Sequence, residues 1–478
     1  MAIDLDTLTI DKAHQALKSG EYSVRELVDA YVAQIAERND ELGAYLHLFE
    51  GIDRQVVQAQ EMYDTGKASI LTGIPIAVKA NIQVEGEICS AGSRMLEGYR
   101  AVYDATAIAR LRKEGVIFLG SANMDEFAMG SSTEHSAFGA TKNPHNTLYV
   151  PGGSSGGSAV AVSAGLALGA LGTDTGGSIR QPASFTGVVG FKGSYGSISR
   201  YGATAMGSSL DQIGPLARTV EDARILYRAM RGADEFDMTT IAESDYQKRD
   251  DQASAKYRIA IPRDFLEGAD QDTRRVFDAT LLALREAGHT VEEVELSSLA
   301  NALAVYYIVM PAEVSSNLAR FDGIRYGYVA DGAMTLSERY IKTRSQGFGS
   351  EVKRRIILGT FVLQAGYANK YYTKALALRE ALKEELGKVF ENYDAIITPT
   401  APTPAFRHGE KSGNPLEMYL ADIYTVPANI AGVPAISLPR GFSSENLPIG
   451  VQLMGGFACD EQVLEIAKEL ERLGESIE

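Results

Sequence analysis

The most informative stretch of this chain is "PGGSSGGSAVAVSAGLALGALGTDTGGSIRQPASFTG", residues 151–187. Near its start, every residue from Gly152 to Ser158 is glycine or serine. Such a run is typical of a flexible linker, yet an apolar, helix-like segment follows at once and no domain boundary lies nearby. The run therefore suggests a structural element that depends on its backbone rather than on side chains.

Short apolar runs alternate with helix-like segments on both sides of this stretch. Buried strands are predicted at residues 73–78, 116–119, 257–262 and 394–400, and helices at 104–115, 158–172 and about 272–287. Asp104 is the expected N-cap of its helix. Continuous apolar strands that alternate with helices are typical of an α/β protein whose sheet is covered on both faces.

The first part of the chain is predicted to be helical. Ser23 and Glu26 form a capping-box pattern at the start of an amphipathic segment, residues 23–38. We expect a single domain, 1–478, with a helical N-terminal region (1–68), a core (69–220) and the remainder of the α/β domain (221–478). The charged segment 243–256 is the best candidate for an exposed loop.

The composition of the chain argues against several classes of function. The formal net charge is −16, which argues against autonomous binding of nucleic acid, since that depends on clustered basic residues. Cys89 and Cys459 are the only cysteines, so we expect two reduced, buried thiols and no cysteine-based metal site. Without a signal-like N-terminus or a long apolar run, we expect a cytoplasmic protein that does not enter a membrane.

Two familiar interpretations of the glycine–serine run have little support. A P-loop needs Gly-Lys-Ser/Thr, which does not occur in this sequence. A nucleophile elbow, G-x-S-x-G, is satisfied with Ser155 or Ser154 as the nucleophile, but such matches are nearly inevitable in a run of glycine and serine. The histidine that a serine triad needs would have to be His289 or His408, and neither lies in a distinctive context.

A wider constellation offers nucleophilic chemistry without histidine. A second Gly-Gly-Ser ends at Ser178, 24 residues after Ser154, which leaves room for one helix and one strand. Upstream, Lys79 follows the predicted strand 73–78. A neutral lysine could take a proton from Ser154, which would take one from Ser178. For that role, burial has to lower the lysine pKa from about 10.4 to near neutrality.

These sites together resemble the layout of the amidase signature family. The resemblance is carried by "GIPIAVK" (73–79), by residues 151–192 and by "SSLDQIGPLARTVEDA" (208–223). Further motifs resemble one branch, the A subunits of glutamyl-tRNA(Gln)/aspartyl-tRNA(Asn) amidotransferases. They are "NMDEFAMGSSTEHSAFG" (123–139), "PAEVSSNLARFDGIRYG" (311–327), "EVKRRIILGTF" (351–361) and "PANIAGVPAISLP" (427–439). The family implies a large mixed central sheet with helices on both faces.

The resemblance also implies roles for particular residues. Ser178 would be the nucleophile, Ser154 a bridging serine that follows a cis peptide bond, and Lys79 the base. The oxyanion hole would be formed by backbone N–H groups of Thr175, Gly176, Gly177 and Ser178. Glutamine would be held by Arg355 at its α-carboxylate and by Asp422 at its α-ammonium. Its pocket would be completed by Met129, Gly130, Ser131 and Tyr306.

The same resemblance implies how the reaction is divided between proteins. This subunit would hydrolyse glutamine without a cofactor or a metal ion. The ammonia would pass to a B-like partner subunit that binds tRNA and uses ATP and Mg²⁺, and a small C-like subunit would complete a heterotrimer. The acidic net charge agrees with a tRNA site on another subunit. The alternatives are a free-standing aliphatic or amino-acid amidase and a catalytically silent scaffold.

Overall fold

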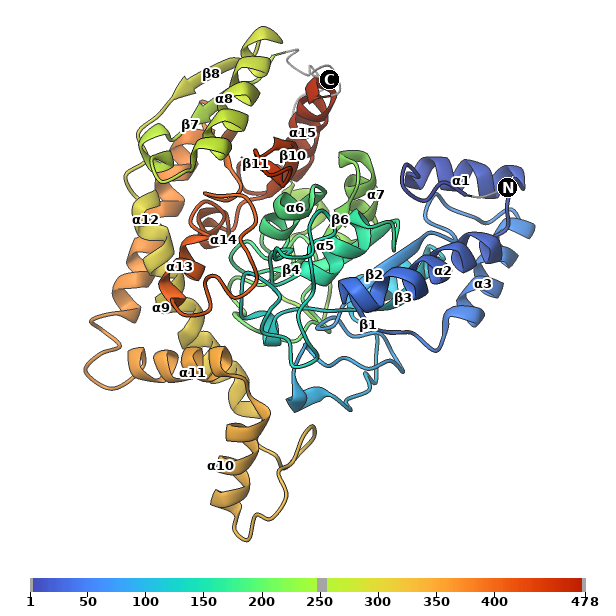
Figure 1. Cartoon of the computed structure of the whole chain (residues 1–478). Coiled ribbons are helices and arrows are strands. Elements are labelled where there is room, and N and C mark those ends of the chain that lie inside the picture. Colours follow the sequence, from blue (N-terminus) through green and yellow to red (C-terminus); the bar gives the residue numbers. More distant parts are fainter. Residues whose placement is uncertain (1–2, 247–255, 475–478) are drawn as a thin grey trace.

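The computed structural model of the protein describes residues 3–246 and 256–474, so most of the charged segment 243–256 lies outside the described residues. The described strands form one mixed sheet in the order β1-β3-β2-β4-β6-β5-β10-β11-β9-β7-β8 (Figure 1). Their bounds are β1 Tyr45–Leu48, β2 Pro75–Lys79, β3 Ile117–Ala122, β4 Gly169–Asp174, β5 Val189–Lys192, β6 Gln212–Ala217, β7 Arg258–Ile261, β8 Thr290–Glu293, β9 Ala395–Pro399, β10 Ala435–Phe442 and β11 Pro448–Met454.

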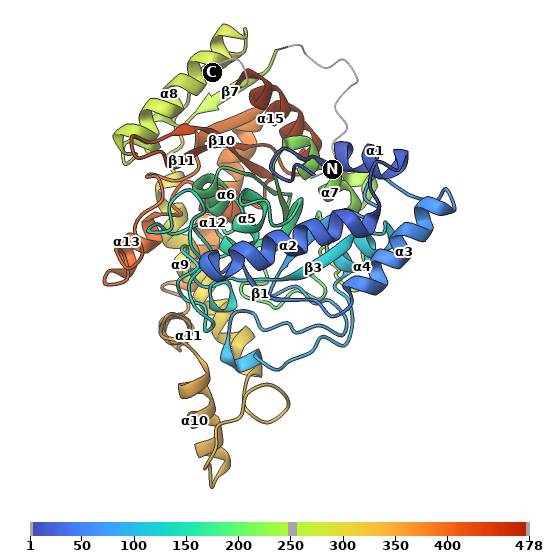
Figure 2. The same cartoon turned by 45° about the vertical axis from the view of Figure 1, so that its right-hand side comes forward.

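Helices cover both faces of this sheet, which confirms the predicted fold class. On one face α7, α8 and α15 pack together, and on the other α5 packs against α6 (Figures 1 and 2). The described α-helices are α1 Ile10–Ser19, α2 Val24–Leu42, α3 Ile52–Asp64, α4 Thr106–Lys113, α5 Gly156–Ser163, α6 Arg180–Thr186, α7 Val220–Met230, α8 Gln271–Glu286, α9 Leu299–Asn317, α10 Leu336–Gly347, α11 Ser350–Val362, α12 Tyr372–Phe390, α13 Pro415–Leu420, α14 Val426–Ala431 and α15 Asp460–Gly474.

Two details of the N-terminal third differ from the sequence prediction. Helix α2 has the expected capping box between Ser23 and Glu26, but the region expected to be helical also contains β1, which pairs with β3. Asp104 is not the N-cap of α4, because its carboxylate forms an ion pair with Arg112, 2.7 Å away. Ala105 is the N-cap residue instead, and it makes no side-chain capping bond.

The site lies at one edge of the sheet, where β2 and β4 end. These two strands are parallel neighbours, so their carboxyl ends, at Lys79 and Asp174, lie at the same edge. All residues of both strands are buried. One glycine-rich turn precedes α5, and a second follows β4. Helix α5 leads from the first turn into β4, which ends at the second. The helix and strand expected between the two turns are confirmed, although α5 ends at Ser163, earlier than predicted.

One part of the chain projects from the compact body. Helix α10 and the loop before it extend away from the sheet (Figures 1 and 2). They follow the long helix α9 and lead directly into α11. Among the helices that the structure describes, none is long and apolar enough to cross a membrane.

Candidate active site

Lys79 ends β2 in an enclosed, hydroxyl-rich environment, and its side chain is fully buried. Its Nζ lies 2.9 Å from Ser154 Oγ, 2.8 Å from Ser155 Oγ and 2.8 Å from Thr173 Oγ1. Burial lowers the pKa of Lys79 to about 7, although the carboxylates of nearby aspartates act in the opposite direction. A substantial fraction of this amine is therefore neutral near pH 7.

The three hydroxyl groups around the Lys79 amine differ in the other hydrogen bonds that they make. Ser155 Oγ donates to the carbonyl oxygen of Thr173, 3.1 Å away, so it can only accept from Lys79. Thr173 Oγ1 accepts a hydrogen bond from Asn81 Nδ2 at 3.0 Å. In the described part of the chain, neither Thr173 Oγ1 nor Ser154 Oγ donates its proton to another group, so either proton can point at the lone pair of a neutral amine.

Close backbone approach explains the glycines of the run that contains Ser154. The peptide bond between Gly153 and Ser154 is cis, as the resemblance implied. A Cβ atom on Gly153 would lie 2.2 Å from Asp125 Oδ2, and one on Gly157 would lie 2.4 Å from the Asn123 carbonyl oxygen. Any side chain at these positions would displace the turn, so the run is a packed element and not a linker.

Ser178 sits beside this turn, at the start of the segment that leads into α6. Its carbonyl oxygen accepts a hydrogen bond from Ser155 N–H at 3.1 Å, which joins the two glycine-rich turns. Ser178 is 9% exposed, and among the described residues its Oγ has no hydrogen-bond partner. Ser154 Oγ and Ser178 Oγ are not joined by a hydrogen bond in this arrangement.

The four predicted oxyanion-hole amides are not equivalent. Gly177 N–H donates to Asp174 Oδ1 at 2.8 Å and is therefore already engaged. Within the described residues, the amides of Thr175, Gly176 and Ser178 make no hydrogen bond. Those three remain available to a negative oxygen at this turn.

A buried ion pair, which sequence reasoning missed, fixes the turn that carries Ser178. Asp174 and Arg180 are both fully buried and form two contacts of 3.0 Å. Arg180 also donates to the Thr425 carbonyl at 2.9 Å, and Asn429 donates to Asp174 at 2.8 Å. Burial opposes ionisation of Asp174, but Arg180 outweighs it and the pKa falls to about 2. The carboxylate is thus charged throughout the physiological range.

A second missed residue, Asp125, organises the loop that carries the predicted pocket residues. Its buried carboxylate accepts hydrogen bonds from the backbone N–H groups of Thr133 and His135, at 2.9 and 3.1 Å. Gln181 joins this loop to the turn before Ser154, because it accepts from Gly153 N–H at 2.9 Å and donates to the Ser131 carbonyl at 2.9 Å. Asp125 and Gln181 therefore hold in place the backbone segments that border the candidate active site.

Arg355 is held in a fixed, buried position on α11. Its Nε lies 2.8 Å from Glu351 Oε1, which also accepts a hydrogen bond from Tyr419 OH at 3.1 Å. The rings of Tyr307 and Tyr419 stack with centroids 3.9 Å apart, and the guanidinium carbon lies 5.7 Å from each. Its Nη2 makes no hydrogen bond among the described residues, so the guanidinium keeps a free donor.

Asp422 is the buried anion of the predicted pocket. Ser131 Oγ donates to its Oδ2 at 2.5 Å, whereas Oδ1 is buried without a partner in the described structure. Burial raises the pKa of Asp422 to about 7. The unpaired oxygen marks a position where a cationic group would satisfy the carboxylate.

The remaining predicted pocket residues lie around these groups. Met129 is buried, and a Cβ atom on Gly130 would lie 2.4 Å from the Asp125 carboxyl carbon. Tyr306 is buried against Gly176, where an added Cβ would lie 2.7 Å from its ring. Asp422 borders the Ser178 turn, because the Thr425 hydroxyl lies 3.0 Å from the Asp422 carbonyl oxygen and 2.7 Å from that of Gly176. Arg355 lies one ring further away, over Tyr307, whose ring centroid is 5.0 Å from that of Tyr306.

The other candidates from the sequence lie elsewhere. His289 accepts from Tyr257 N–H at 3.1 Å, and His408 lies 3.6 Å from Glu134. Neither contacts a serine of the glycine-rich run. Cys89 is buried, as expected, but Cys459 is only half-buried, so the expectation of two buried thiols is wrong for that residue. In the described ranges, no cluster of histidine, cysteine and carboxylate side chains could hold a metal ion.

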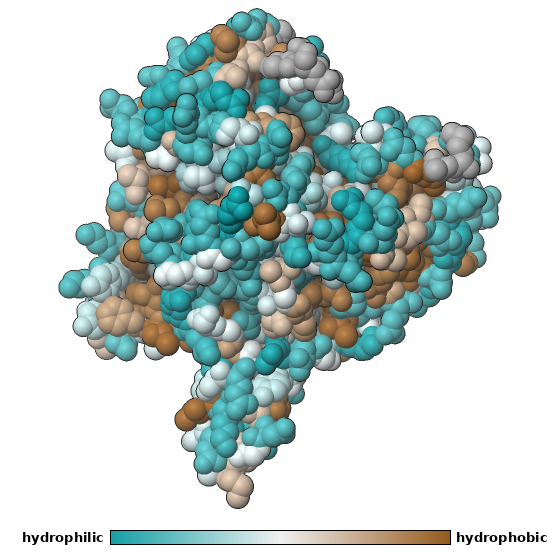
Figure 3. Space-filling model, viewed as in Figure 1, coloured by the Kyte–Doolittle hydropathy of each residue, from teal (hydrophilic) through white to brown (hydrophobic). Residues whose placement is uncertain are grey.

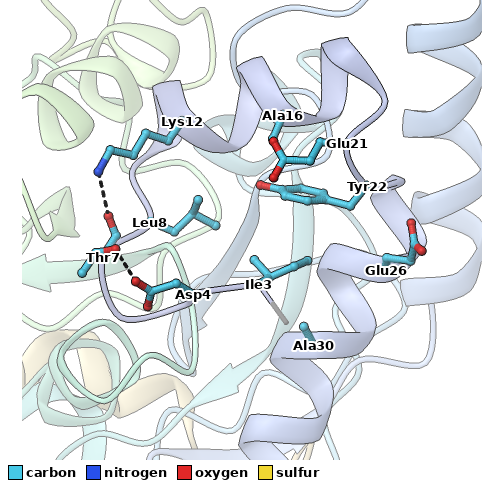
Figure 4. A pocket seen from close by; sticks show the side chains of 10 residues that line it. All are labelled: Ile3, Asp4, Thr7, Leu8, Lys12, Ala16, Glu21, Tyr22, Glu26 and Ala30. Atoms are coloured by element: carbon cyan, nitrogen blue, oxygen red, sulfur yellow. Dashed lines mark hydrogen bonds between the residues drawn. The ribbon is translucent and has the colours of Figure 1, made fainter. Parts of the chain in front are cut away.

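A surface pocket of about 520 Å³ lies between the N-terminal segment and helices α1 and α2 (Figure 4). None of the residues that line it is a predicted site residue. Its polar contacts are local, such as the 2.6 Å hydrogen bond from Thr7 to Asp4. The pocket therefore belongs to the packing of the N-terminal helices and not to the Lys79 site.

Known proteins resemble the whole chain. The glutamyl-tRNA(Gln) amidotransferase A subunit from Halothermothrix orenii is 46% identical over 475 residues, 98% of each chain. The one from Methylacidiphilum infernorum is 48% identical over 461 residues, which cover 96% of this chain and 92% of the relative. The crystal structure of the corresponding glutamyl-tRNA(Gln) amidotransferase chain from Thermotoga maritima superposes with a TM-score of 0.80 at 40% identity, covering 98% of this chain and 95% of that one.

The sequence model of the amidase family matches residues 26–464. That range contains every residue of the Lys79 site and all of the described sheet. With relatives nearly half identical along their full length, the resemblance is not confined to the glycine-rich motifs. This chain belongs to the amidase family.

Proposed function

We propose that this protein hydrolyses glutamine as one subunit of a tRNA-dependent amidotransferase. The observation that carries the proposal is the 2.9 Å contact between Lys79 Nζ and Ser154 Oγ, in an enclosure where burial lowers the pKa of Lys79 to about 7. A neutral amine there can act as a base at physiological pH. The relatives named as amidotransferase A subunits give the chemistry its context.

The proposed reaction begins when Ser178 Oγ attacks the side-chain amide carbon of glutamine. The Ser178 proton moves to Ser154 as the Ser154 proton moves to Lys79. Because Ser178 Oγ has no competing hydrogen bond among the described residues, it can turn toward Ser154 when substrate enters. The free amides of Thr175, Gly176 and Ser178 donate hydrogen bonds to the tetrahedral oxyanion. Each lowers the free energy of the transition state by about 3–4 kcal/mol.

Collapse of this intermediate breaks the carbon–nitrogen bond. The proton on Lys79 returns through Ser154 to the leaving nitrogen, so ammonia departs and a γ-glutamyl ester remains on Ser178. Water then attacks the ester with the same proton path, which releases glutamate and restores the serine. No metal ion or cofactor is required of this chain for either half of the reaction.

The charged pocket residues suit free glutamine. Arg355 can donate to the α-carboxylate because its planar fork matches that group and one nitrogen remains unpaired. The unpaired Oδ1 of Asp422 can accept from the α-ammonium. Tyr306, Ser131 and the backbone of Met129 and Gly130 enclose the carbon chain between them.

The ammonia is then transferred to a partner subunit. In the proposed complex a B-like subunit binds misacylated Glu-tRNA(Gln) or Asp-tRNA(Asn) and activates it with ATP and Mg²⁺, while a small C-like subunit completes a heterotrimer. The net charge of −16 supports a division in which this chain does not bind tRNA itself.

The proposal is tested by measuring ammonia release from glutamine by the chain with its partner subunits. Wild type should release ammonia and glutamate in equal amounts, and Ser178→Ala should reduce the rate by at least about 10³-fold, as loss of a nucleophile does. Unchanged hydrolysis by Ser178→Ala would contradict the assigned nucleophile.

A free-standing amidase is the alternative that the solved structures keep open, since one described simply as an amidase superposes with a TM-score of 0.81 at 29% identity. Arg355→Lys and Asp422→Asn separate the two functions. Both variants should raise KM for glutamine while leaving slow hydrolysis of an uncharged aliphatic amide unchanged. Preference of wild type for the uncharged amide would favour the alternative.

A further inference from the structure

Asp211 is a buried carboxylate that contacts the turn that carries Ser178 but is not a predicted site residue. It lies one residue before β6, which runs antiparallel to β4. The last pair of that ladder joins Asp174 to Gln212, so the same register places Asp211 opposite Thr175. The two residues are 36 positions apart in the sequence, and sequence reasoning missed the contact between them.

A hydrogen bond between side chains continues the pairing where the backbone ladder stops. Thr175 Oγ1 donates to Asp211 Oδ1 at 2.7 Å. Thr175 is 1% exposed, and a Cβ atom on Gly207 would lie 3.4 Å from its Cγ2. Both branches of the Thr175 side chain are therefore in contact with neighbours, which holds it in one rotamer.

Asp211 can hold Thr175 because its own carboxylate is fixed. It accepts hydrogen bonds from Met206 N–H at 2.9 Å and from Gly207 N–H at 3.1 Å. Burial raises the pKa of Asp211 to about 6, so the carboxylate is mostly ionised above neutral pH. A hydroxyl group that donates to an ionised acceptor makes a strong, charge-assisted hydrogen bond.

The loop that carries Asp211 is held in turn by two helices outside the sheet. Glu313 of α9 accepts a hydrogen bond from Ser209 N–H at 2.9 Å. Arg379 of α12 donates to the hydroxyl and to the carbonyl oxygen of Ser209, at 2.9 Å each. The loop is therefore a fixed anchor for Thr175, and not a segment that adapts to it.

The contact matters because of the place of Thr175 in the turn. The backbone ladder of β4 ends at Asp174, and the free amides of Thr175 and Gly176 follow directly. Gly176 has no side chain that could fix it, and its carbonyl oxygen accepts a hydrogen bond from Thr425 Oγ1 at 2.7 Å. Between the end of the ladder and that contact, the Thr175 side chain is the attachment that orients the two amides.

We infer that Asp211 is a positioning residue for this reaction, because through the Thr175 hydroxyl it keeps the Thr175 and Gly176 amides aimed at the oxyanion. The inference rests on the proposed function, in which these amides form part of the oxyanion hole. Donors of this kind accelerate a reaction only when they are fixed in advance where negative charge develops. A small displacement of the turn should therefore lower kcat and leave the binding of glutamine almost unchanged.

The test is a double-mutant cycle, measured as ammonia release from glutamine by the chain with its partner subunits. Thr175→Val removes the hydroxyl and keeps the shape of the side chain. Asp211→Asn keeps the size but leaves one acceptor oxygen for three donors. Each variant should lower kcat about tenfold with KM within about twofold. The double variant should also lose about tenfold, because both substitutions break the same contact.

Two further variants complete the cycle. Thr175→Ser keeps the hydroxyl, so its kcat should stay within about threefold of wild type. If Asp211→Asn does not fold, Asp211→Glu takes its place with the same expected values, because it keeps both oxygens and moves them by one methylene group. Thermal unfolding of each variant measures any loss of stability separately from the loss of rate.

Asp222→Asn is the matched control. Asp222 is also buried, burial also raises its pKa to about 6, and it accepts a hydrogen bond from Ile10 N–H at 2.9 Å. It lies on α7, where it holds the start of α1, so its variant should keep kcat within about twofold of wild type. An unchanged or higher kcat in Asp211→Asn would overturn the inference. Losses that multiply to about a hundredfold in the double variant would also overturn it, since Asp211 would then act independently of Thr175.

A fluorophosphonate probe separates the inference from the proposed function. Ser178 Oγ attacks the phosphorus, its proton passes to Ser154 and fluoride leaves, while the phosphoryl oxygen takes the place of the oxyanion. Labelling of Ser178, located by peptide mass spectrometry, should be about tenfold slower in Thr175→Val and in Asp211→Asn.

The two assays together identify which claim fails. If wild type is labelled but does not hydrolyse glutamine, and both variants are labelled slowly, the function is wrong and the role of Asp211 stands. If wild type hydrolyses glutamine and Asp211→Asn matches it in both assays, the role of Asp211 is wrong and the function stands. A wild type that neither hydrolyses glutamine nor is labelled on Ser178 would overturn both.

Discussion

Lys79 and Lys192 are both last residues of strands in the same sheet, and both are almost completely inaccessible to solvent. Burial lowers the pKa of each amine to about 7, and Arg180 adds to the effect at Lys192. The two differ in their partners. Lys79 Nζ contacts three hydroxyl groups and also the Thr173 carbonyl oxygen, at 3.2 Å. The acceptors of Lys192 Nζ in the described structure are the carbonyl oxygens of Gly193 and Val433, at 2.8 and 2.6 Å.

This difference shows that a shifted pKa alone does not identify a catalytic base. A carbonyl oxygen accepts a hydrogen bond but has no proton to give, so the amine of Lys192 can only hold two backbone segments together. A hydroxyl group both gives and accepts a proton, so the amine of Lys79 can take part in a relay. The partner atoms, rather than the burial, distinguish the two lysines.

The largest expected effect comes from making the same substitution at both positions. Lys79→Met should lower kcat for glutamine hydrolysis by about 10³-fold or more, because it removes the proton acceptor of the relay. Lys192→Met should leave kcat within about threefold of wild type. Steady-state ammonia release measures both, with circular dichroism to establish that each variant folds. Equal losses in the two variants would remove the distinction between the lysines.

The pH dependence of the reaction should follow Lys79. Because the neutral amine is the active form and burial lowers its pKa to about 7, kcat/KM should rise about tenfold per pH unit below that value and level off above it. Asp422, whose pKa is also about 7, steepens the rise, and Asp422→Asn should restore the slope of a single proton. A profile that stays flat from about pH 6 to about pH 8 would contradict a neutral lysine base.

Removing one hydroxyl partner should have a smaller effect. Ser155→Ala takes one hydrogen-bond acceptor from the ammonium form of Lys79, so the rising limb of the pH profile should move to lower pH. The value of kcat should fall about tenfold, since the amine is held less firmly beside Ser154. Ser158→Ala, whose hydroxyl donates to the Leu171 carbonyl outside the relay, is the control. A shift of the rising limb to higher pH in Ser155→Ala would contradict a hydrogen bond that stabilises the ammonium form of Lys79.

The smallest effect concerns stability. Each lysine has an ordinary pKa of 10.5 and a folded value of about 7, so between these values the folded state binds fewer protons than the unfolded state. The free energy of unfolding should therefore rise with pH across that window. Lys192→Met should reduce this slope by up to about 1.4 kcal/mol per pH unit. Urea titrations at several pH values measure it, and an unchanged slope would mean that Lys192 keeps its ordinary pKa.

Local patterns predicted much of the fold and the centre of the site. The apolar runs indicated the strand that ends at Lys79, and the capping box of α2 followed from Ser23 and Glu26. Residues 169–172 were expected to end a helix and instead begin β4. The 24-residue spacing between Ser154 and Ser178 matched one helix and one strand, which bring the two turns into contact. Each of these features depends on residues close in sequence, where periodicity and spacing are informative.

The supporting contacts were not predicted because they join distant parts of the chain. Arg180 reaches Thr425 and Asn429, more than 240 residues away, and no local pattern marks such a contact. Asp104 was misassigned because a helix N-cap and an ion-pair partner look alike in sequence. The apolar residues of α10 and the loop before it have the composition of a core segment, and only their position on a projection (Figure 3) reveals that they are exposed.

The most direct test of the account is to trap the covalent intermediate that it requires. The wild-type complex, quenched with acid during turnover of glutamine, should give a γ-glutamyl ester that peptide mass spectrometry locates on Ser178. The ester should be absent from Ser178→Ala and strongly reduced in Lys79→Met, but present at the wild-type level in Lys192→Met. An ester on Ser154 or Ser155, or one that forms equally in Lys79→Met, would contradict a relay from Ser178 through Ser154 to Lys79.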